Sequence, residues 1–372
     1  MLWTAAKEAG SPANWEHYLD QVRIIANQKE HGLLEAIIAN YKAKNAYAEV
    51  ADFAGFLQDS FQQLDELNKE VDRVQSRATR NQSTYLTWDH MDVYFATSMR
   101  KAWEYKDLYE FIERLMTSDE VKELDLRYFD PTQAFTDNRV NKGLVEALML
   151  KRARCTVYSV QDTDTLGKDS ELASTLAQGK PVIAYVPDLD PTERAEQLLS
   201  EDPVTVLERW RFVLSADGQL VQRLSDEEYD TVGRVQNELN KFSGQRIWSS
   251  IRDDDAIRLL REVIGQDLER FCQLIARSEK AVYDTRANTL SGIHPLAFQV
   301  NLETGVANGV LVVRTIPDCA SLLRRVLLAE MDFTVVEEDG MWHLRERISG
   351  CTYRVVTNDR KLNNCFWNFY LR

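Results

Sequence analysis

Apolar residues recur at helical spacing through the first part of the chain. Within residues 14–80 two such segments follow one another, one centred on residues 33–41 and the other on residues 50–74. This pattern predicts two antiparallel helices, or a helical arm, over residues 1–82. Because two amphipathic helices have little core of their own, we expect this arm to pack against a partner or to mediate oligomerisation.

After residue 81 short apolar runs alternate with helical patterns. Strands are predicted at residues 91–97, 124–129, 155–160 and 181–186, with helices at 102–116, 142–153 and 169–178. Strict alternation of strands and helices is typical of a parallel sheet built by right-handed crossovers. We therefore predict an α/β core of the Rossmann-like (flavodoxin-like) kind over residues 83–187, with ligands bound beyond the carboxyl ends of its strands.

After residue 187 the predicted secondary structure changes twice along the chain. Residues 188–291 are again helical in pattern and predict a helical insertion. Residues 292–372 predict a C-terminal α/β segment that is β-rich towards its end, with strands at 309–315 and 352–357, a helix at 318–330 and a hairpin at 333–347. The strand at 309–315 is expected to complete the parallel sheet.

Composition narrows the class of protein. A hydrophobic content of 44% with 28% charged residues is typical of a folded globular chain. The net charge of -14 argues against a nucleic-acid binder, because such proteins neutralise phosphates with lysine and arginine. No stretch approaches the roughly 18 to 20 apolar residues that span a bilayer, and the start of the chain does not resemble a signal peptide, so we expect a cytoplasmic protein.

The cysteines and histidines suggest neither a disulfide framework nor a metal site. The five cysteines are odd in number and form no C-x-x-C pair, which indicates reduced, buried thiols. The five histidines are scattered and lack metal-ligand spacing, and no serine-triad or phosphate-loop motif accompanies them. We therefore expect no metal and no resident cofactor. The C-terminal aromatic residues are expected to close the hydrophobic core of the last strands: Phe366, Trp367, Phe369 and Tyr370.

The stretch from residue 162 to 187, DTDTLGKDSELASTLAQGKPVIAYVP, carries the candidate chemistry. Asp169 or Ser170 is predicted to cap a helix whose free N–H groups can hold an anion such as a phosphate. Glu171 is then expected in the first turn, facing the strand ends. A carboxylate there can attack or stabilise an oxocarbenium-like sugar carbon, as cleavage of an N-glycosidic bond requires. The alternative is an ordinary carboxylate interacting with the helix dipole.

From Gly167 onwards the pattern Gly-x-x-x-Glu-Leu-x-x-x-x-Ala-x-Gly-Lys-Pro-Val-Ile resembles the nucleoside 2-deoxyribosyltransferase superfamily, and the layout is similar to the related TIR domains. The resemblance covers about residues 91–187. It implies that Glu171 is the nucleophile and that Tyr94, in the first strand, is the family's tyrosine. It also matches Glu146 to an acidic residue on the helix before the third strand. Six positions before the glutamate, where the family has aspartate, this chain has Thr165 beside Asp164.

Further polar residues follow the predicted strands. Arg100 has the forked donors that hold a phosphate, although a surface charge is an equal alternative. Asp130 is expected either to bind a ribose hydroxyl or to cap the turn with Pro131. The candidate catalytic residues are thus Glu171, Tyr94 and Glu146, and the candidate substrate-binding residues are Ser98, Arg100, Asp130, Asp164, Gly167, Asp169 and Ser170.

These residues and the resemblance lead to one principal hypothesis. We expect an N-glycosidase that hydrolyses a nucleotide such as NAD, and the resemblance implies a regulated effector in bacterial antiphage defence. The alternatives are a nucleotide-sensing module without turnover and a deoxyribosyltransferase. The helical arm and the C-terminal segment exceed what a metabolic transferase needs. They are therefore expected to sense a trigger, such as a regulatory protein partner, or to assemble a homo-oligomer.

Overall fold

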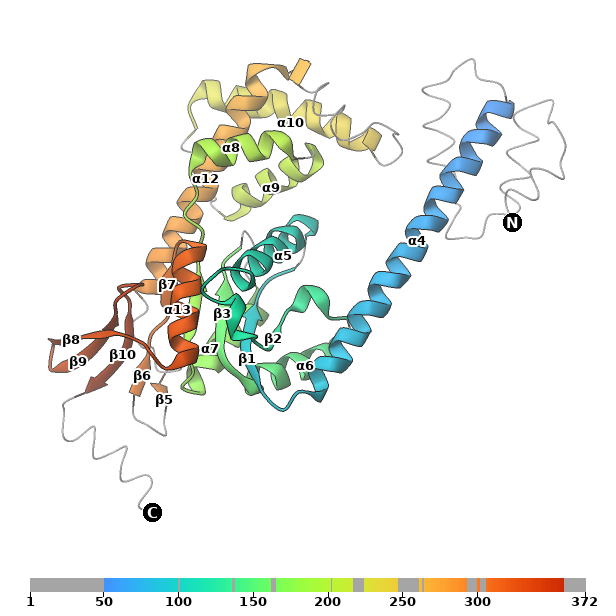
Figure 1. The fold of residues 1–372 in the computed structure, drawn as a ribbon. Coiled ribbons are helices and arrows are strands. Elements are labelled where there is room, and N and C mark those ends of the chain that lie inside the picture. Colours follow the sequence, from blue (N-terminus) through green and yellow to red (C-terminus); the bar gives the residue numbers. More distant parts are fainter. Residues whose placement is uncertain are drawn as a thin grey trace. The chain divides into compact units, whose positions relative to one another are not determined.

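The computed structural model describes residues 50–99, 101–135, 138–161, 165–201, 203–216, 224–246, 261–262, 264–292, 300–301 and 306–357 (Figure 1). The chain divides into two compact units. One comprises Met1–Ser76, Asp202–Val204 and Gly233–Gly265, and the other comprises Arg77–Glu201, Thr205–Val232 and Gln266–Arg372. We call the second the core unit. Both sheets and all of the candidate catalytic residues belong to it.

Helix α4 (Val50–Thr87) confirms the predicted helical pattern of residues 50–74 and continues to the start of the sheet. Its last turns belong to the core unit, where Tyr85 is buried and packs edge-on against Phe129 at a centroid distance of 5.4 Å. The first of the two predicted N-terminal helices lies outside the described residues, so the antiparallel pairing stays a prediction.

The core unit is built on a parallel sheet of five strands, β1 (Met91–Ala96), β2 (Tyr128–Phe129), β3 (Ala153–Ser159), β4 (Val182–Tyr185) and β7 (Leu311–Val313). Their order is β2-β1-β3-β4-β7, and every neighbouring pair is parallel. The predicted α/β class and the four parallel strands within residues 91–186 are therefore confirmed, as is the completion of the sheet by residues 309–315. In this flavodoxin-like order the topological switch point lies between β1 and β3.

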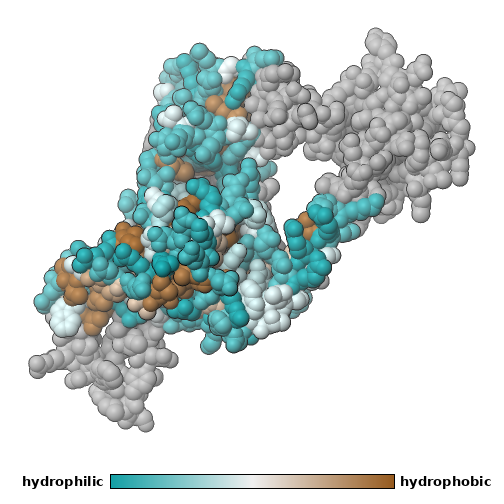
Figure 2. Space-filling model, viewed as in Figure 1, coloured by the Kyte–Doolittle hydropathy of each residue, from teal (hydrophilic) through white to brown (hydrophobic). Residues whose placement is uncertain are grey.

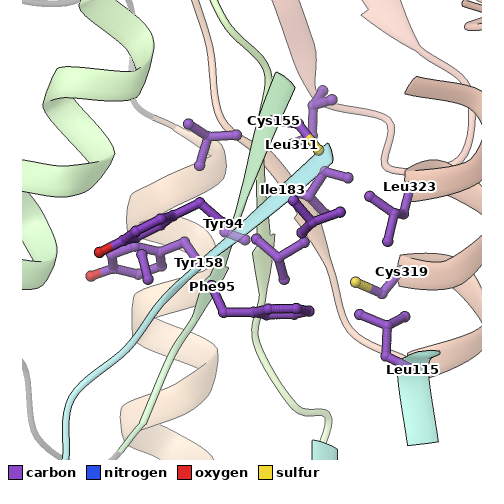
Figure 3. Close-up of a cluster of buried hydrophobic side chains, with 14 of the residues drawn as sticks. Tyr94, Phe95, Leu115, Cys155, Tyr158, Ile183, Leu311, Cys319 and Leu323 are labelled. Atoms are coloured by element: carbon purple, nitrogen blue, oxygen red, sulfur yellow. The ribbon is translucent and has the colours of Figure 1, made fainter. Parts of the chain in front are cut away.

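Helices cover both faces of this sheet. α5 (Ala102–Met116) and α13 (Ile316–Leu328) contact each other and pack on one face, whereas α6 (Arg139–Arg152) and α7 (Leu166–Ala177) pack on the other. Neighbouring residues of β1 point to opposite faces, as the strand geometry requires. Phe95 meets Phe111 of α5, while Tyr94 points towards α7. Figure 3 shows the hydroxyl groups of Tyr94 and Tyr158 on the side away from Cys319 and Leu323 of α13.

One predicted strand is much shorter in the structure. The apolar pattern of residues 124–129 predicted a full strand, but only Tyr128–Phe129 pair with β1. Residues Lys122–Leu124 instead form a 3-10 turn, η1, which ends at Asp125. Asp125 has a φ of 48° in the left-handed region, and this conformation cannot continue a strand.

The described part of residues 188–291 is helical, as predicted, and comprises α8 (Pro191–Ser200), α9 (Pro203–Ala216), α10 (Asp226–Arg246) and α12 (Gln266–Ser291). α8 packs along α12 within the core unit. Trp210 of α9 is fully buried and its ring lies 5.1 Å from that of Phe271 in α12. Helices α8 and α9 therefore both pack on α12.

A second, antiparallel sheet follows in the order β5-β6-β10-β9-β8, formed by β5 (Val300–Asn301), β6 (Val306–Asn308), β8 (Phe333–Glu338), β9 (Met341–Glu346) and β10 (Thr352–Thr357). The predicted hairpin is confirmed: β8 and β9 pair around Asp339 and Gly340, which both have positive φ, as tight hairpin turns prefer. On the face drawn in Figure 2 hydrophobic surface gathers near this sheet. Leu328 at the end of α13 and Val335 in β8 are exposed hydrophobic residues.

Gly309 marks the passage from the second sheet back to the first. A Cβ atom at this position would lie 1.9 Å from the carbonyl oxygen of Thr352, which is backbone and has no freedom to retreat. The Gly309 N–H also donates to the carbonyl of Tyr353 at 2.8 Å. Only glycine allows β10 to approach so closely.

Candidate active site

Helix α7 carries Glu171 and begins earlier than the sequence pattern indicated. Thr165 is its N-cap, and the Thr165 hydroxyl accepts a hydrogen bond from the backbone N–H of Lys168 at 3.2 Å. The predicted caps Asp169 and Ser170 are therefore wrong, because both already lie inside the helix. Glu171 is the sixth residue of α7 and occupies its second turn rather than its first. In this position its side chain meets the hydroxyl of Tyr94 in β1.

Tyr94 and Glu171 form the centre of the site. The Tyr94 hydroxyl donates to Oε1 of Glu171 at 2.7 Å, joining the first strand to the helix after the third. Tyr94 is 1% exposed, and its ring stacks on Phe129 at 5.3 Å with an interplanar angle of 14°. The tyrosine is therefore held rigidly by the core and fixes the position of the carboxyl group.

Glu146 supplies a second carboxyl group from α6. Its side chain is 25% exposed and lies 3.6 Å from the Lys142 ammonium. Burial raises the pKa of Glu146, and the Lys142 charge partly offsets this. The structure thus brings together all three predicted catalytic residues, Tyr94, Glu146 and Glu171, on the face of the sheet that α6 and α7 cover.

The environment of Glu171 disfavours its charged form. Burial raises the pKa of Glu171 to about 8. The Tyr94 hydrogen bond opposes the shift, the Glu146 charge adds to it, and Lys142 and Lys168 lower the pKa. Burial and the two carboxyl groups in turn raise the pKa of Tyr94 well above its usual range, so the phenol keeps its proton and remains a donor. Two carboxyl groups in unequal surroundings are a frequent arrangement in acid–base and glycosidic chemistry.

Lys168 and Tyr158 belong to the same face but were not predicted. Lys168 is 1% exposed, and its Nζ donates to the carbonyl of Ser159 at 3.1 Å and lies 4.6 Å from the centroid of the Tyr158 ring. The Tyr158 hydroxyl donates to Asp169 at 2.8 Å. A signal was present in the sequence, since Lys168 occupies a position on the buried stripe that continues through Leu172 and Leu176.

Ser98 and Asp130, two of the substrate-binding candidates, take part in local structure. Ser98 is buried, and its N–H donates to the side chain of Gln161 at 2.6 Å. Asp130 caps the short turn η2 (Pro131–Gln133) by accepting from the backbone N–H of Thr132 at 2.8 Å, which matches the capping alternative. Burial raises the pKa of Asp130.

Of the substrate-binding candidates on α7, Gly167 is exposed in its first turn. The exposed hydroxyl of Ser170 donates to the carbonyl of Gly167 at 2.7 Å. Asp169 is held by Tyr158. Arg100 and Asp164 lie outside the described residues, as do the C-terminal aromatic residues from Phe366 onwards.

No metal-binding arrangement of histidine, cysteine, aspartate and glutamate occurs in the part of the chain that the structure describes. The four cysteines described there are free and buried, and Cys365 lies outside. Among the helices of the described ranges, none has the length and apolar character that crossing a membrane requires.

Comparisons of the chain with protein-family models, curated proteins and solved structures found no match. The chemical interpretation of the site therefore depends on the geometry of Tyr94, Glu146 and Glu171 and on the short motif around them.

Proposed function

We propose that this protein is an N-glycosidase that hydrolyses a nucleotide such as NAD, with Glu171 as the central carboxylate. The observation that carries the proposal is the buried Glu171 carboxyl group, bonded to Tyr94 at 2.7 Å and influenced by a second carboxyl group on Glu146. Tyr94 lies on β1, one of the two strands that flank the switch point of the flavodoxin-like sheet, and ligands of this fold class bind beyond the carboxyl ends of such strands.

The proposed reaction breaks the bond between C1′ of the ribose and the nitrogen of the base. The electron pair of that bond leaves with the base, and positive charge develops on the sugar. Ionised Glu171 stabilises this charge or forms a bond to C1′, and Tyr94 holds its carboxylate in position. A water oxygen then bonds to C1′, and where Glu171 had bonded to C1′ that bond breaks and its electron pair returns to the carboxylate. One proton of the water passes to Glu146, which later releases it to solvent. The products are the free base, the ribosyl fragment and one proton.

The raised pKa of Glu171 favours a substrate that is positively charged at the reacting bond. In the empty site a pKa of about 8 leaves most of the Glu171 population protonated at neutral pH. A cation placed beside the carboxyl group lowers its pKa and generates the reactive carboxylate. The pyridinium ring of NAD is such a cation, and it leaves as neutral nicotinamide without needing a proton. Substrate binding would thus ionise the residue that attacks it.

The start of α7 offers a place for the phosphates of this substrate. Leu166 and Gly167 form its exposed first residues, and backbone N–H groups at a helix N-terminus favour anions. Arg100 stays a candidate for the same role on the evidence of the sequence.

The decisive experiment measures base release from NAD and from a panel of nucleosides. We expect Glu171→Gln to lower turnover by at least about a hundredfold while retaining ligand binding, because the lost interaction forms mainly in the transition state. Glu113→Gln is the matched control, since Glu113 is exposed on α5, on the other face of the sheet. A Glu171→Gln protein that cleaves like the parent would refute the mechanism.

The same assay separates the two alternatives. A nucleotide sensor binds without releasing base, and the protonated state of Glu171 at neutral pH favours this alternative, since a neutral carboxyl group still forms hydrogen bonds. A deoxyribosyltransferase yields a new nucleoside when an acceptor base is added. On the resemblance alone, we further propose a regulated role in antiphage defence. Phage plating on cells that express the parent or Glu171→Gln protein tests this role, and equal plating would contradict it.

A further inference from the structure

A cavity lies on the other face of the parallel sheet, where α5 and α13 pack. Its volume is about 270 Å³, and it is formed at the carboxyl ends of β3 and β4. Ser159 and Gln161 come from the end of β3, Tyr185 from β4, and the helices α5, α8, α9, α12 and α13 complete the wall. The proposed mechanism uses none of the residues that line it. Its size suits a small ligand, since drug-sized molecules occupy pockets of roughly 300 to 1,000 Å³.

One wall of the cavity is aromatic. The rings of Phe111 and Tyr185 stack at a centroid distance of 4.3 Å and an interplanar angle of 2°. Leu108 and Tyr283 extend this apolar wall. Planar aromatic surfaces favour offset stacking with another flat ring. The wall therefore favours a flat aromatic ligand.

Another part of the lining is polar and contains Arg194, a partly buried arginine with two long hydrogen bonds. Arg194 donates through Nε to Glu279 at 2.7 Å, and Glu279 is 1% exposed. The Nη1 of Arg194 lies 3.3 Å from the Gln197 side-chain oxygen and 3.5 Å from a Glu201 carboxylate oxygen. Both distances exceed the usual 2.7 to 3.2 Å of a good N–H···O bond. A ligand oxygen at 2.7 to 3.2 Å from Nη1 would form a stronger hydrogen bond than either of these side chains does. This polar part of the lining thus complements a ring that carries hydrogen-bond acceptors.

The charge of the lining disfavours a phosphate. Four acidic side chains line the cavity, against three arginines: Glu104, Asp107, Glu110 and Glu279 against Arg114, Arg194 and Arg209. The carboxylates of Asp107 and Glu279 already neutralise Arg209 and Arg194, at 2.9 and 2.7 Å. Arg114 has no described carboxylate partner, but the lining as a whole carries three positive and four negative side chains, a net charge of -1. A dianionic group is therefore disfavoured, most directly by the exposed carboxylate of Glu110.

We propose that this cavity binds a nucleobase or a nucleoside without a 5′-phosphate. The aromatic residues stack on the base, the polar residues meet its hydrogen-bonding edge, and the net negative charge of the lining disfavours nucleotides. This inference does not rest on the proposed N-glycosidase activity, because the cavity and Glu171 lie on opposite faces of the sheet. It concerns binding alone.

The experiment is isothermal titration of the full chain with the four common nucleosides, their free bases and their 5′-monophosphates. We expect at least one nucleoside or base to bind, and the matching monophosphate to bind at least about tenfold more weakly at low ionic strength. Tyr185→Leu should weaken nucleoside binding by about tenfold or more, because base–aromatic stacking contributes roughly 1 to 3 kcal/mol, while Tyr185→Phe keeps the ring and should bind normally.

A pair of exposed substitutions keeps the test independent of folding. Glu110 lines the cavity and Glu113 lies outside it, and both are exposed on α5. Glu110→Lys should strengthen monophosphate binding relative to the nucleoside, whereas Glu113→Lys should have much less effect. The proposal is overturned if no nucleoside or base binds, if monophosphates bind as tightly in the parent, if free phenylalanine or tyrosine binds in their place, or if the two lysine variants behave alike.

Discussion

Replacing Glu171 by glutamine should change how the stability of the fold depends on pH. Burial raises the pKa of Glu171 from 4.5 to about 8, so the folded state holds this proton more tightly than the unfolded chain does. Its contribution to stability is fully present below about pH 4.5 and is lost as the pH rises through 8. Since a pKa difference of one corresponds to about 1.4 kcal/mol, the parent should lose up to about 4 kcal/mol relative to the glutamine variant between pH 5 and pH 9.

That loss is large compared with the roughly 5 to 15 kcal/mol by which most domains are stable. It can be measured by urea unfolding at pH 5, 7 and 9, followed by tryptophan fluorescence and circular dichroism, with coincident transitions required for a two-state treatment. Because glutamine does not ionise but still accepts from Tyr94, the two proteins should be closest in stability at pH 5, and the variant should be clearly more stable at pH 9. Glu113→Gln should follow the parent throughout. Parallel stability curves for the parent and Glu171→Gln from pH 5 to 9 would refute the reasoning.

Three further predictions concern activity and packing. If ionised Glu171 is the reactive form, kcat/KM for base release should rise with pH through about 8, and a rate that falls over this range would indicate that the protonated form acts. Tyr94→Phe removes the donor that lowers the pKa of Glu171, so it should move the rising limb to higher pH and destabilise the fold by about 1 to 3 kcal/mol, whereas an unmoved pH profile would contradict this role. Gly309→Ala should destabilise the protein by about 3 kcal/mol or more in thermal unfolding, because the new Cβ would collide with the Thr352 carbonyl. Gly143→Ala is the control and should not destabilise the protein, because its Cβ would meet no atom within 4 Å.

The elements that the sequence predicted well are those with strong periodicity. The helix expected at residues 102–116 and the strand expected at 352–357 have those bounds in the structure, because buried faces impose the spacing directly. The start of α7 was misplaced because Thr165, Asp169 and Ser170 are all good N-caps within a few residues. A tertiary contact favours Thr165 as the N-cap, because the Tyr158 hydroxyl donates to Asp169 at a position inside the helix.

The candidate site was accessible from the sequence only through the short motif. Tyr94 and Glu171 are 77 residues apart, and neither helical nor strand periodicity relates them. Lys168 was overlooked because a charged residue on a buried stripe is read as an exposed one until its partner, the Ser159 carbonyl, is known. The cavity at the carboxyl ends of β3 and β4 is lined by residues that range from Glu104 to Ile316 in the sequence. No local sequence pattern could therefore predict it.

The alternation of side chains along β3 has a consequence for how this protein can change in evolution. Tyr158 faces Asp169 of α7, whereas its neighbour in the strand, Val157, projects to the opposite face, as strand geometry requires. Point substitutions can therefore alter the chemistry on one face of the sheet while the other keeps its shape. Insertion or deletion of a single residue within β3 has a larger effect. Every side chain of the strand after that point then projects to the opposite face of the sheet. We expect the length of β3 to be conserved among descendants more strictly than the identity of its individual residues.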